Sequence, residues 1–106
     1  RDFTYIDDII NGIEKCIKIK KSNIYFKIFN LGNSKPINLL TFIKIIEKKL
    51  NIKAKKKFLP LQKGDIQKTH SNISFAKNKL KFNPKVSPKL GVSKFIDWFL
   101  FYYINK

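Results

Sequence analysis

Residues 24–31 constrain the fold of this 106-residue chain more than any other segment. They are rich in β-branched and aromatic residues, with little polar relief on either face, and they end at Gly32 and Asn33, a pair typical of turns. A strand buried on both faces belongs in the interior of a parallel sheet. The other long strand candidate, residues 53–59, carries lysines that favour a sheet edge. We therefore predict an α/β segment with too few strands to close a sheet alone.

Four helices are expected as well, because apolar residues recur at three- and four-residue intervals. They follow a short extended piece at residues 3–5 and cover, in order, a stretch with isoleucines at positions 6, 9, 10, 13 and 17, residues 39–50, residues 74–80, and a stretch beginning at Ser87 and Pro88. The expected N-cap residues are Asn38 for the second helix, Ser71 or Asn72 for the third, and Ser87 for the last.

The chain begins at Arg1 and contains no methionine, so we interpret it as part of a larger protein. Without neighbouring strands to cover residues 24–31, the segment alone should expose apolar surface. We expect it to be marginally stable or prone to aggregation by itself.

The net charge of +16 raises the question of a nucleic-acid partner. Only Arg1 is arginine, whereas proteins that read phosphates and bases favour the bidentate arginine fork. Lysine, isoleucine and asparagine make up nearly half of the chain, and codons of A and T alone encode all three. Drift in base composition therefore explains the charge, and we predict no nucleic-acid partner. A small basic nucleic-acid-binding protein stays the alternative.

The single cysteine, Cys16, excludes an internal disulfide and a cysteine-based metal site. It lies among isoleucines, which predicts a small buried core residue in a reducing, cytoplasmic setting. No apolar run approaches the ~20 residues that span a bilayer, so we expect no membrane segment. His70 is the only histidine and no carboxylates cluster, so we expect no metal site.

Four stretches, in order along the chain, carry one family pattern. Residues 1–9 read RDFTYIDDI and residues 29–33 read FNLGN. Residues 58–66 read FLPLQKGDI, and the tail has LKFNP at residues 80–84, GV at residues 91–92 and FIDWF at residues 95–99. These resemble the RDFxYVDDV, YNIGN, FxPMQPGDV, LGFxP and GIxxFVxW segments of extended short-chain dehydrogenase/reductases, the NAD-dependent nucleotide-sugar epimerases and dehydratases. The third stretch resembles the UDP-glucuronate 4-epimerase branch in particular.

The resemblance implies that residues 1–106 are the C-terminal, substrate-binding portion of a Rossmann-type enzyme of the UDP-glucuronate 4-epimerase type. NAD is then bound mainly by an N-terminal portion that this sequence lacks, so no catalytic or cofactor-binding residue is expected here. Arg1 matches the family arginine that contacts the substrate diphosphate, and Asp65 matches the carboxylate that accepts hydrogen bonds from ribose hydroxyls. Gln62 stands where many relatives carry a second phosphate-binding arginine. The partners implied are a UDP-sugar and a second copy of the complete enzyme.

Other interpretations of the same residues stay open. From the residues alone, Arg1 forms a surface salt bridge with Asp2 or Asp7, and Asp65 is an ordinary turn aspartate. A 4,6-dehydratase or a decarboxylase shares these C-terminal motifs, and a decayed relative that acts only as an interaction module is a further alternative. His70 and Asn72 depart from the family's aromatic residue and aspartate. Tyr102 and Lys106 have the spacing of the family's catalytic pair, which we interpret as a chance match.

Overall fold

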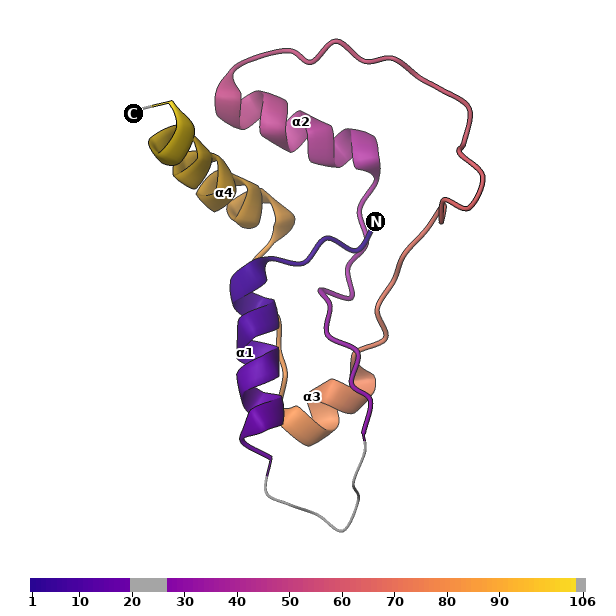
Figure 1. Ribbon diagram of the computed structural model, residues 1–106, viewed down its shortest axis with the longest axis vertical. Helices are drawn as coiled ribbons and strands as arrows, with labels where there is room; N and C mark the ends of the chain where they lie inside the picture. Colours follow the sequence, from indigo (N-terminus) through magenta and orange to yellow (C-terminus); the bar gives the residue numbers. More distant parts are fainter. Residues whose placement is uncertain (20–26, 105–106) are drawn as a thin grey trace.

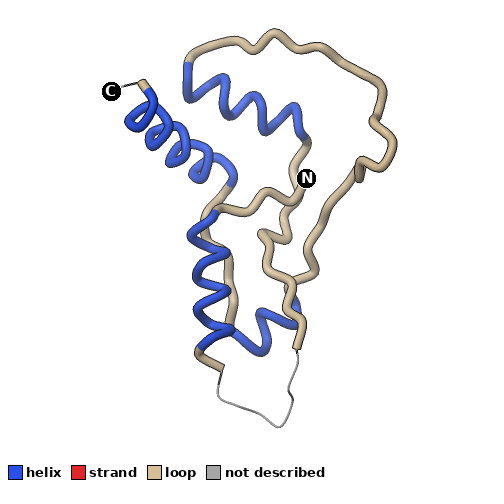
Figure 2. Tube along the Cα trace, in the orientation of Figure 1, coloured by secondary structure: helices blue, strands red, loops and turns tan. Residues whose placement is uncertain are grey.

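The computed structural model describes residues 1–19 and 27–104 (Figure 1). Within this part of the chain the helices are α1 (Ile6–Ile17), α2 (Leu39–Leu50), α3 (Ser74–Leu80) and α4 (Pro88–Tyr103). All of the expected helices are therefore confirmed, including both bounds of α2 and α3. The described residues between them are loops and turns (Figure 2).

The predicted N-caps explain why α2 and α4 begin where they do, whereas the N-cap of α3 is Ile73 and not the expected Ser71 or Asn72. The side chains of Asn38 and Ser87 accept a backbone N–H in the first turns of α2 and α4, at 2.8 and 3.3 Å. The Oδ1 atom of Asn72 accepts the Ser74 N–H at 3.0 Å, although Ile73 holds the N-cap position of α3. Each bond satisfies a donor that the helix itself leaves without a partner.

The helices form two pairs at opposite ends of the molecule, with α2 beside α4 and α1 beside α3 (Figure 1). A small core of Ala76, Leu80 and Phe82 lies at the α1–α3 end, and Phe82 is fully buried. Gly12 of α1 permits this packing, because a Cβ there would lie 2.8 Å from a methyl group of Leu31 and 3.0 Å from the Phe82 ring. A larger residue would force α1 away from this core.

The carboxylate of Asp8 links the start of α1 to the segment that precedes α4. It is buried, and its two oxygens accept the backbone N–H groups of Lys85 and Val86, both at 2.9 Å. Two neighbouring loop amides are therefore satisfied without a strand partner.

The two expected long strands do not form in the described residues. Residues 53–59 are an exposed loop, and residues 27–31 carry no strand; residues 20–26 lie outside the described part. The N–H and C=O groups of a strand form hydrogen bonds with those of a neighbouring strand. The described residues form no such ladder of hydrogen bonds. The prediction of a strand was therefore wrong for residues 53–59 and 27–31, which form loops.

The isoleucine face of α1 is another departure from expectation. Ile6, Ile10, Ile13 and Ile17 are exposed, while the buried positions are Asp8 and Gly12. Cys16 was predicted to be buried, and it is half-buried against the α1–α3 core. The amphipathic pattern identified the helix correctly, but no described element covers its apolar stripe.

The molecule is more open than a compact domain of its size. Its accessible surface is 9160 Å², whereas a compact monomer of this mass exposes about 6,200 Å². Its radius of gyration is 17.2 Å, against about 13 Å for a compact domain of this length. Aromatic residues of α4 contribute to the excess, including Phe95, Trp98 and Phe101. The expected exposure of apolar surface is therefore confirmed.

The described residues contain neither a membrane-spanning helix nor a group of side chains placed to hold a metal ion. In that part of the chain, none of the helices has the length and hydropathy to cross a membrane. Within the same ranges, no group of three or more histidine, cysteine, aspartate or glutamate side chains is placed to hold a metal ion.

The excess surface leads to a testable prediction for the 106-residue polypeptide produced by itself. We expect it to bind a hydrophobic dye and to self-associate, because about 3,000 Å² more surface is exposed than in a compact monomer. Replacing the 73% exposed Phe101 with Glu should lower dye fluorescence and association. Asn78→Glu adds the same charge on exposed α3 and serves as the control. Light scattering and fluorescence provide the readouts, and a dye-free monomer contradicts the prediction.

Candidate functional site

Residues 51–68, here called the arm, form a long loop. It leaves the end of α2 and returns toward the opening segment, residues 1–5 (Figure 1). Every residue of the arm is exposed. Its course is therefore set by contacts at its two ends and at the few points where it touches the rest of the chain.

Glu47 of α2 holds the first end of the arm. Its side chain is buried, and Oε1 accepts both the Ala54 backbone N–H, at 2.9 Å, and the Lys56 ammonium. The hydrogen bond from Lys56, reinforced by that from Ala54, lowers the pKa of Glu47 from its ordinary value of 4.5. The ionised carboxylate is thus the form that the folded arm favours.

The middle of the arm contains the predicted loop, and it forms a tight turn. The Asp65 N–H donates to the Gln62 carbonyl oxygen at 3.1 Å, and Gly64 has a φ of +87°. This is the pattern of a type II turn, in which the third residue must adopt positive φ. Nothing lies within 4 Å of a Cβ built at Gly64, so backbone conformation alone requires glycine there.

The turn brings Asp65 to Arg1. The Nη2 atom of Arg1 lies 2.5 Å from Oδ1 of Asp65, across 64 positions of sequence. The side chains are 31% and 47% exposed, so the pair contributes no more than about 1 kcal/mol. The partner is Asp65 and not Asp2 or Asp7, since Asp7 pairs with Lys94. Two of the predicted site residues are therefore adjacent, and Gln62 lies in the same turn.

Asp2 gathers three separate segments, and the sequence analysis did not identify it. Its Oδ2 atom accepts the N–H groups of Ser34 and Ser71, at 3.0 and 2.9 Å, and Oδ1 accepts that of Lys35 at 3.1 Å. Its own N–H donates to Oγ1 of Thr69 at 3.0 Å. The only signal in the sequence was its position beside Arg1 in the opening motif.

The remaining polar residues of this region do not form a catalytic arrangement. His70 is exposed, and its Nε2 atom lies 3.4 Å from the Ser34 hydroxyl. Thr4 accepts the Asn33 N–H through its hydroxyl at 2.9 Å. Asn33 is buried, and its Nδ2 atom has no hydrogen-bond partner in the described part of the chain. Lys106, of the chance pair with Tyr102, lies outside the described residues.

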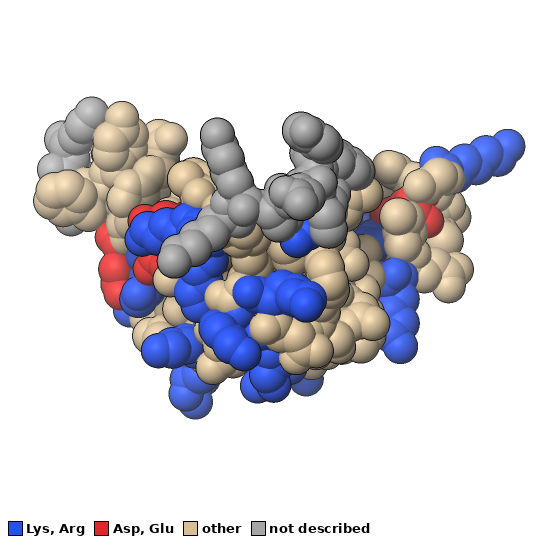
Figure 3. Space-filling view, turned by 90° about the horizontal axis from the view of Figure 1, so that it is seen from below, with Lys and Arg blue, Asp and Glu red and all other residues tan. Residues whose placement is uncertain are grey.

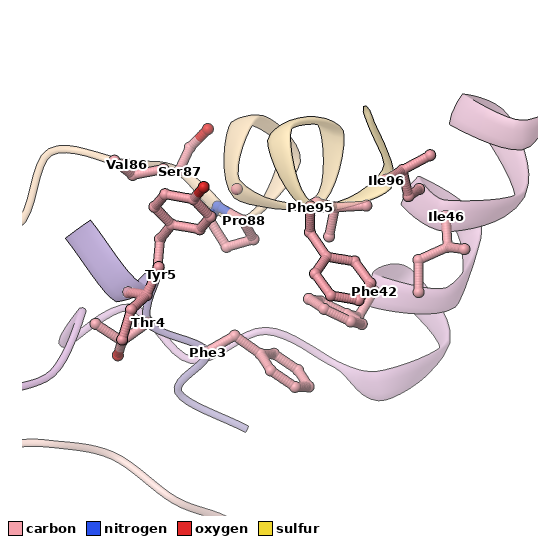
Figure 4. Close-up of a pocket in the computed structure, with 13 residues that line it drawn as sticks. Phe3, Thr4, Tyr5, Phe42, Ile46, Val86, Ser87, Pro88, Phe95 and Ile96 are labelled. Carbon is pink, nitrogen blue, oxygen red and sulfur yellow. The ribbon is translucent and has the colours of Figure 1, made fainter. Parts of the chain in front are cut away.

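A cavity of about 420 Å³ lies between the opening segment, α2 and α4 (Figure 4). Its walls are mostly aromatic and aliphatic, and Phe3 stacks on Phe42 with ring centroids 3.8 Å apart. No charged side chain lines it. The cavity therefore does not offer a place for a diphosphate, and Arg1 and Asp65 lie outside its lining.

Lysines are spread over the surface. Figure 3 shows them scattered across the face at the α1–α3 end, with carboxylates at its two sides. Within the arm, Lys63 lies in the turn itself, and further lysines stand at positions 53, 55, 56, 57 and 68. The general positive field favours an anionic ligand on this chain, but it does not by itself identify a binding site.

Comparison with known proteins places the chain beside epimerases, although no family model matches it. It is 50% identical over 100 residues to an uncharacterized protein of Methanocaldococcus jannaschii, covering 94% of this chain and 30% of that protein. It is 40% identical to UDP-glucuronate 4-epimerase 5 of Arabidopsis thaliana, covering 97% of this chain and 26% of the relative.

The solved structures agree. The crystal structure of UDP-glucuronic acid 4-epimerase from Bacillus cereus, in complex with UDP-glucuronic acid and NAD, matches 97% of this chain at a TM-score of 0.88 and 34% identity. Over nearly its whole length, the chain is therefore similar in sequence and in structure to a part of UDP-glucuronate 4-epimerases. It spans about a quarter to a third of the length of these relatives, including 32% of the Bacillus cereus chain. The resemblance seen in the opening motif and in the arm is therefore confirmed.

The anchor at Glu47 predicts a pH dependence. Because the pKa of Glu47 is lowered in the folded state, its contribution is fully present above pH 4.5 and is lost as the pH falls through the folded-state pKa. Glu47→Gln should therefore reduce the loss of Ala54 amide protection on acidification, while lowering that protection at neutral pH. Hydrogen exchange measures it. Glu14→Gln, which removes an exposed carboxylate paired only with Lys18, is the control, and identical profiles for wild type and Glu47→Gln contradict the prediction.

The turn predicts an effect at Gly64. Gly64→Ala should weaken the Asp65-to-Gln62 hydrogen bond by about 1 kcal/mol, because alanine disfavours positive φ. Amide exchange at Asp65 should speed up about fivefold. Lys63→Ala, at the neighbouring turn position with negative φ, should leave this rate unchanged. Equal rates in both variants would show that the turn does not depend on glycine.

Proposed function

We propose that this chain is the substrate-side part of an NAD-dependent UDP-glucuronate 4-epimerase and that it holds the UDP moiety. The main support is the match of nearly the whole chain to an epimerase whose crystal structure contains UDP-glucuronic acid and NAD. The meeting of Arg1 and Asp65 gives this proposal a location on the molecule. In the complete enzyme we expect a cytoplasmic homodimer.

Arg1 is suited to the diphosphate. Its guanidinium carries five N–H donors in a planar fork, and the bond to Asp65 engages only Nη2. The remaining donors suit a diphosphate in a charge-assisted, bidentate contact. Its backbone is held on both sides, since Arg1 and Ile37 exchange N–H···O bonds of 2.8 and 3.0 Å. Only the side chain has to adjust to a ligand.

Asp65 and Gln62 complete the proposed grip. Asp65 is about half exposed, and its free oxygen Oδ2 is suited to accept from the hydroxyls of a ribose. Gln62, exposed at the start of the same turn, offers amide donors without adding charge. The arrangement matches a ligand that carries negative charge and a diol side by side, as a nucleoside diphosphate does.

NAD, when bound by the remainder of the enzyme, accepts and returns a hydride at C4 of the sugar. The described residues of this chain offer no paired acid and base near Arg1, since His70 contacts only Ser34 there. The contribution we propose is therefore binding: a fixed UDP handle lets the oxidised sugar turn over and present its opposite face.

The proposal is tested in the full-length polypeptide with NAD. We expect conversion of UDP-glucuronate to its C4 epimer, measured by chromatography. Arg1→Ala should raise KM about tenfold or more, because it removes a charge-assisted bond worth roughly 1.5–3 kcal/mol. Arg1→Lys should fall between, since it keeps the charge and loses the fork. Lys57→Ala removes an equal charge from the exposed arm and should change KM little.

Other results of this experiment would contradict or change the proposal. An unchanged KM in Arg1→Ala removes Arg1 from the site. A wild-type enzyme that leaves UDP-glucuronate untouched contradicts the epimerase proposal, and a 4-keto-6-deoxy or decarboxylated product assigns the chain to a dehydratase or a decarboxylase instead.

A further inference from the structure

We propose that Asp2 is a positioning residue for the UDP grip, because it holds the returning end of the arm at the distance from Arg1 that lets Asp65 reach the guanidinium. This inference rests on the proposed function. It deepens that function by assigning a role to a carboxylate that touches neither Arg1 nor the proposed ligand-binding atoms.

The first support is the connectivity of Asp2. Its carboxylate accepts backbone N–H groups that are 32, 33 and 69 positions away in sequence, those of Ser34, Lys35 and Ser71. A single side chain thus joins the opening segment, the turn after Gly32 and the end of the arm. Hydrogen bonds to an ionised acceptor are roughly twice as strong as those between neutral groups. No other described carboxylate accepts amides from two separate segments.

The second support is the close packing at the place where Asp2, Gly32 and Ser71 meet, here called the junction. A Cβ built at Gly32 would lie 2.4 Å from the Cβ of Ser71 and 3.3 Å from Oδ2 of Asp2. The first distance is shorter than real Cβ contacts allow, so the backbone at Gly32 lies directly against the Ser71 side chain, just beyond the end of the arm. The junction therefore has little freedom to slide.

The third support is the short length of chain between the junction and the site. Asp65 precedes Thr69 by four residues, which span at most about 14 Å when fully extended. Thr69 receives the Asp2 N–H and Ser71 donates to the Asp2 carboxylate, so the far end of this short piece is fixed. Arg1 is the residue next to Asp2, and its backbone is fixed by Ile37. The Asp2 contacts therefore fix the chain on the Asp65 side of the ion pair, and the bonds with Ile37 fix it on the Arg1 side.

The Arg1–Asp65 pair cannot hold the arm by itself. Both side chains are partly exposed, and such pairs are weak and screened by salt. All residues of the arm between its anchors are exposed as well. The order required for a grip on UDP must come from the anchors. The contacts of Asp2, at Thr69 and Ser71, lie nearer to Asp65 along the chain than those of Glu47, at Ala54 and Lys56.

Substitution of Asp2 in the full-length enzyme tests this inference. We expect Asp2→Ala to raise KM for UDP-glucuronate and Kd for UDP about fivefold, with kcat within twofold of wild type. Asp2→Asn should have a smaller effect, because its single carbonyl oxygen can replace Oδ2 while its amide group opposes the Lys35 N–H. Asp7→Asn, which removes an exposed carboxylate paired with Lys94, is the charge control and should change neither constant.

A double-mutant cycle separates positioning from folding. If Asp2 acts through Arg1 and Asp65, the effect of Asp2→Ala on the Kd for UDP should largely disappear in an Arg1→Ala background. Thr69→Val removes the acceptor of the Asp2 N–H without changing charge or shape, so it should weaken UDP binding in the same direction. Thr41→Val, on the exposed surface of α2, is its matched control.

The outcomes distinguish this inference from the proposed function. An active wild type with an unchanged UDP Kd in Asp2→Ala, or effects of Asp2→Ala and Arg1→Ala that simply add, overturns the positioning role. If Asp2→Ala does not fold, Thr69→Val decides, and an unchanged Kd there overturns the role. If the wild type does not convert UDP-glucuronate, the proposed function fails. Amide exchange at Ser71 in Thr69→Val then still tests the junction, and unchanged protection counts against it.

Discussion

Backbone amides outside the helices must find acceptors, and in this chain carboxylates supply them in place of a sheet. Asp2 accepts from three loop amides, Asp8 from two, and Glu47 from one. The described residues form no strand ladder, so without these bonds several loop N–H groups would be left without protein acceptors. The positions of the opening segment, the arm and the approach to α4 all depend on this use of acidic side chains.

Acidic residues are scarce in this chain, so few side chains are available to accept these backbone N–H groups. The chain has seven aspartates and glutamates against 23 basic residues. Three of the seven hold backbone amides, and the other four pair with basic side chains at Arg1, Lys18, Lys49 and Lys94. A highly basic protein thus places each of its carboxylates where it has a partner, while lysines lie scattered across the face at the α1–α3 end (Figure 3).

Packing is local at each end of the molecule, and it leaves much apolar surface uncovered. The core around Phe82 is small, and it depends on the close approach that Gly12 permits. The isoleucine stripe of α1 and the aromatic residues of α4 remain exposed. The homologous enzymes are three to four times as long as this chain. Surfaces of this kind become stable only when further apolar surface covers them.

The sequence by itself determined the helices, their caps and the family. Apolar spacing, Asn38, Ser87 and Pro88 predict local structure through interactions within a few residues, and these survive in any tertiary setting. Residues 53–59 were mispredicted because a strand requires a distant partner, which local sequence does not report. Arg1 and Asp65 could be proposed from motifs, but their contact could not. Only the tertiary structure revealed the junction at Asp2, because a carboxylate's backbone partners 32 to 69 positions away depend on how the whole chain folds.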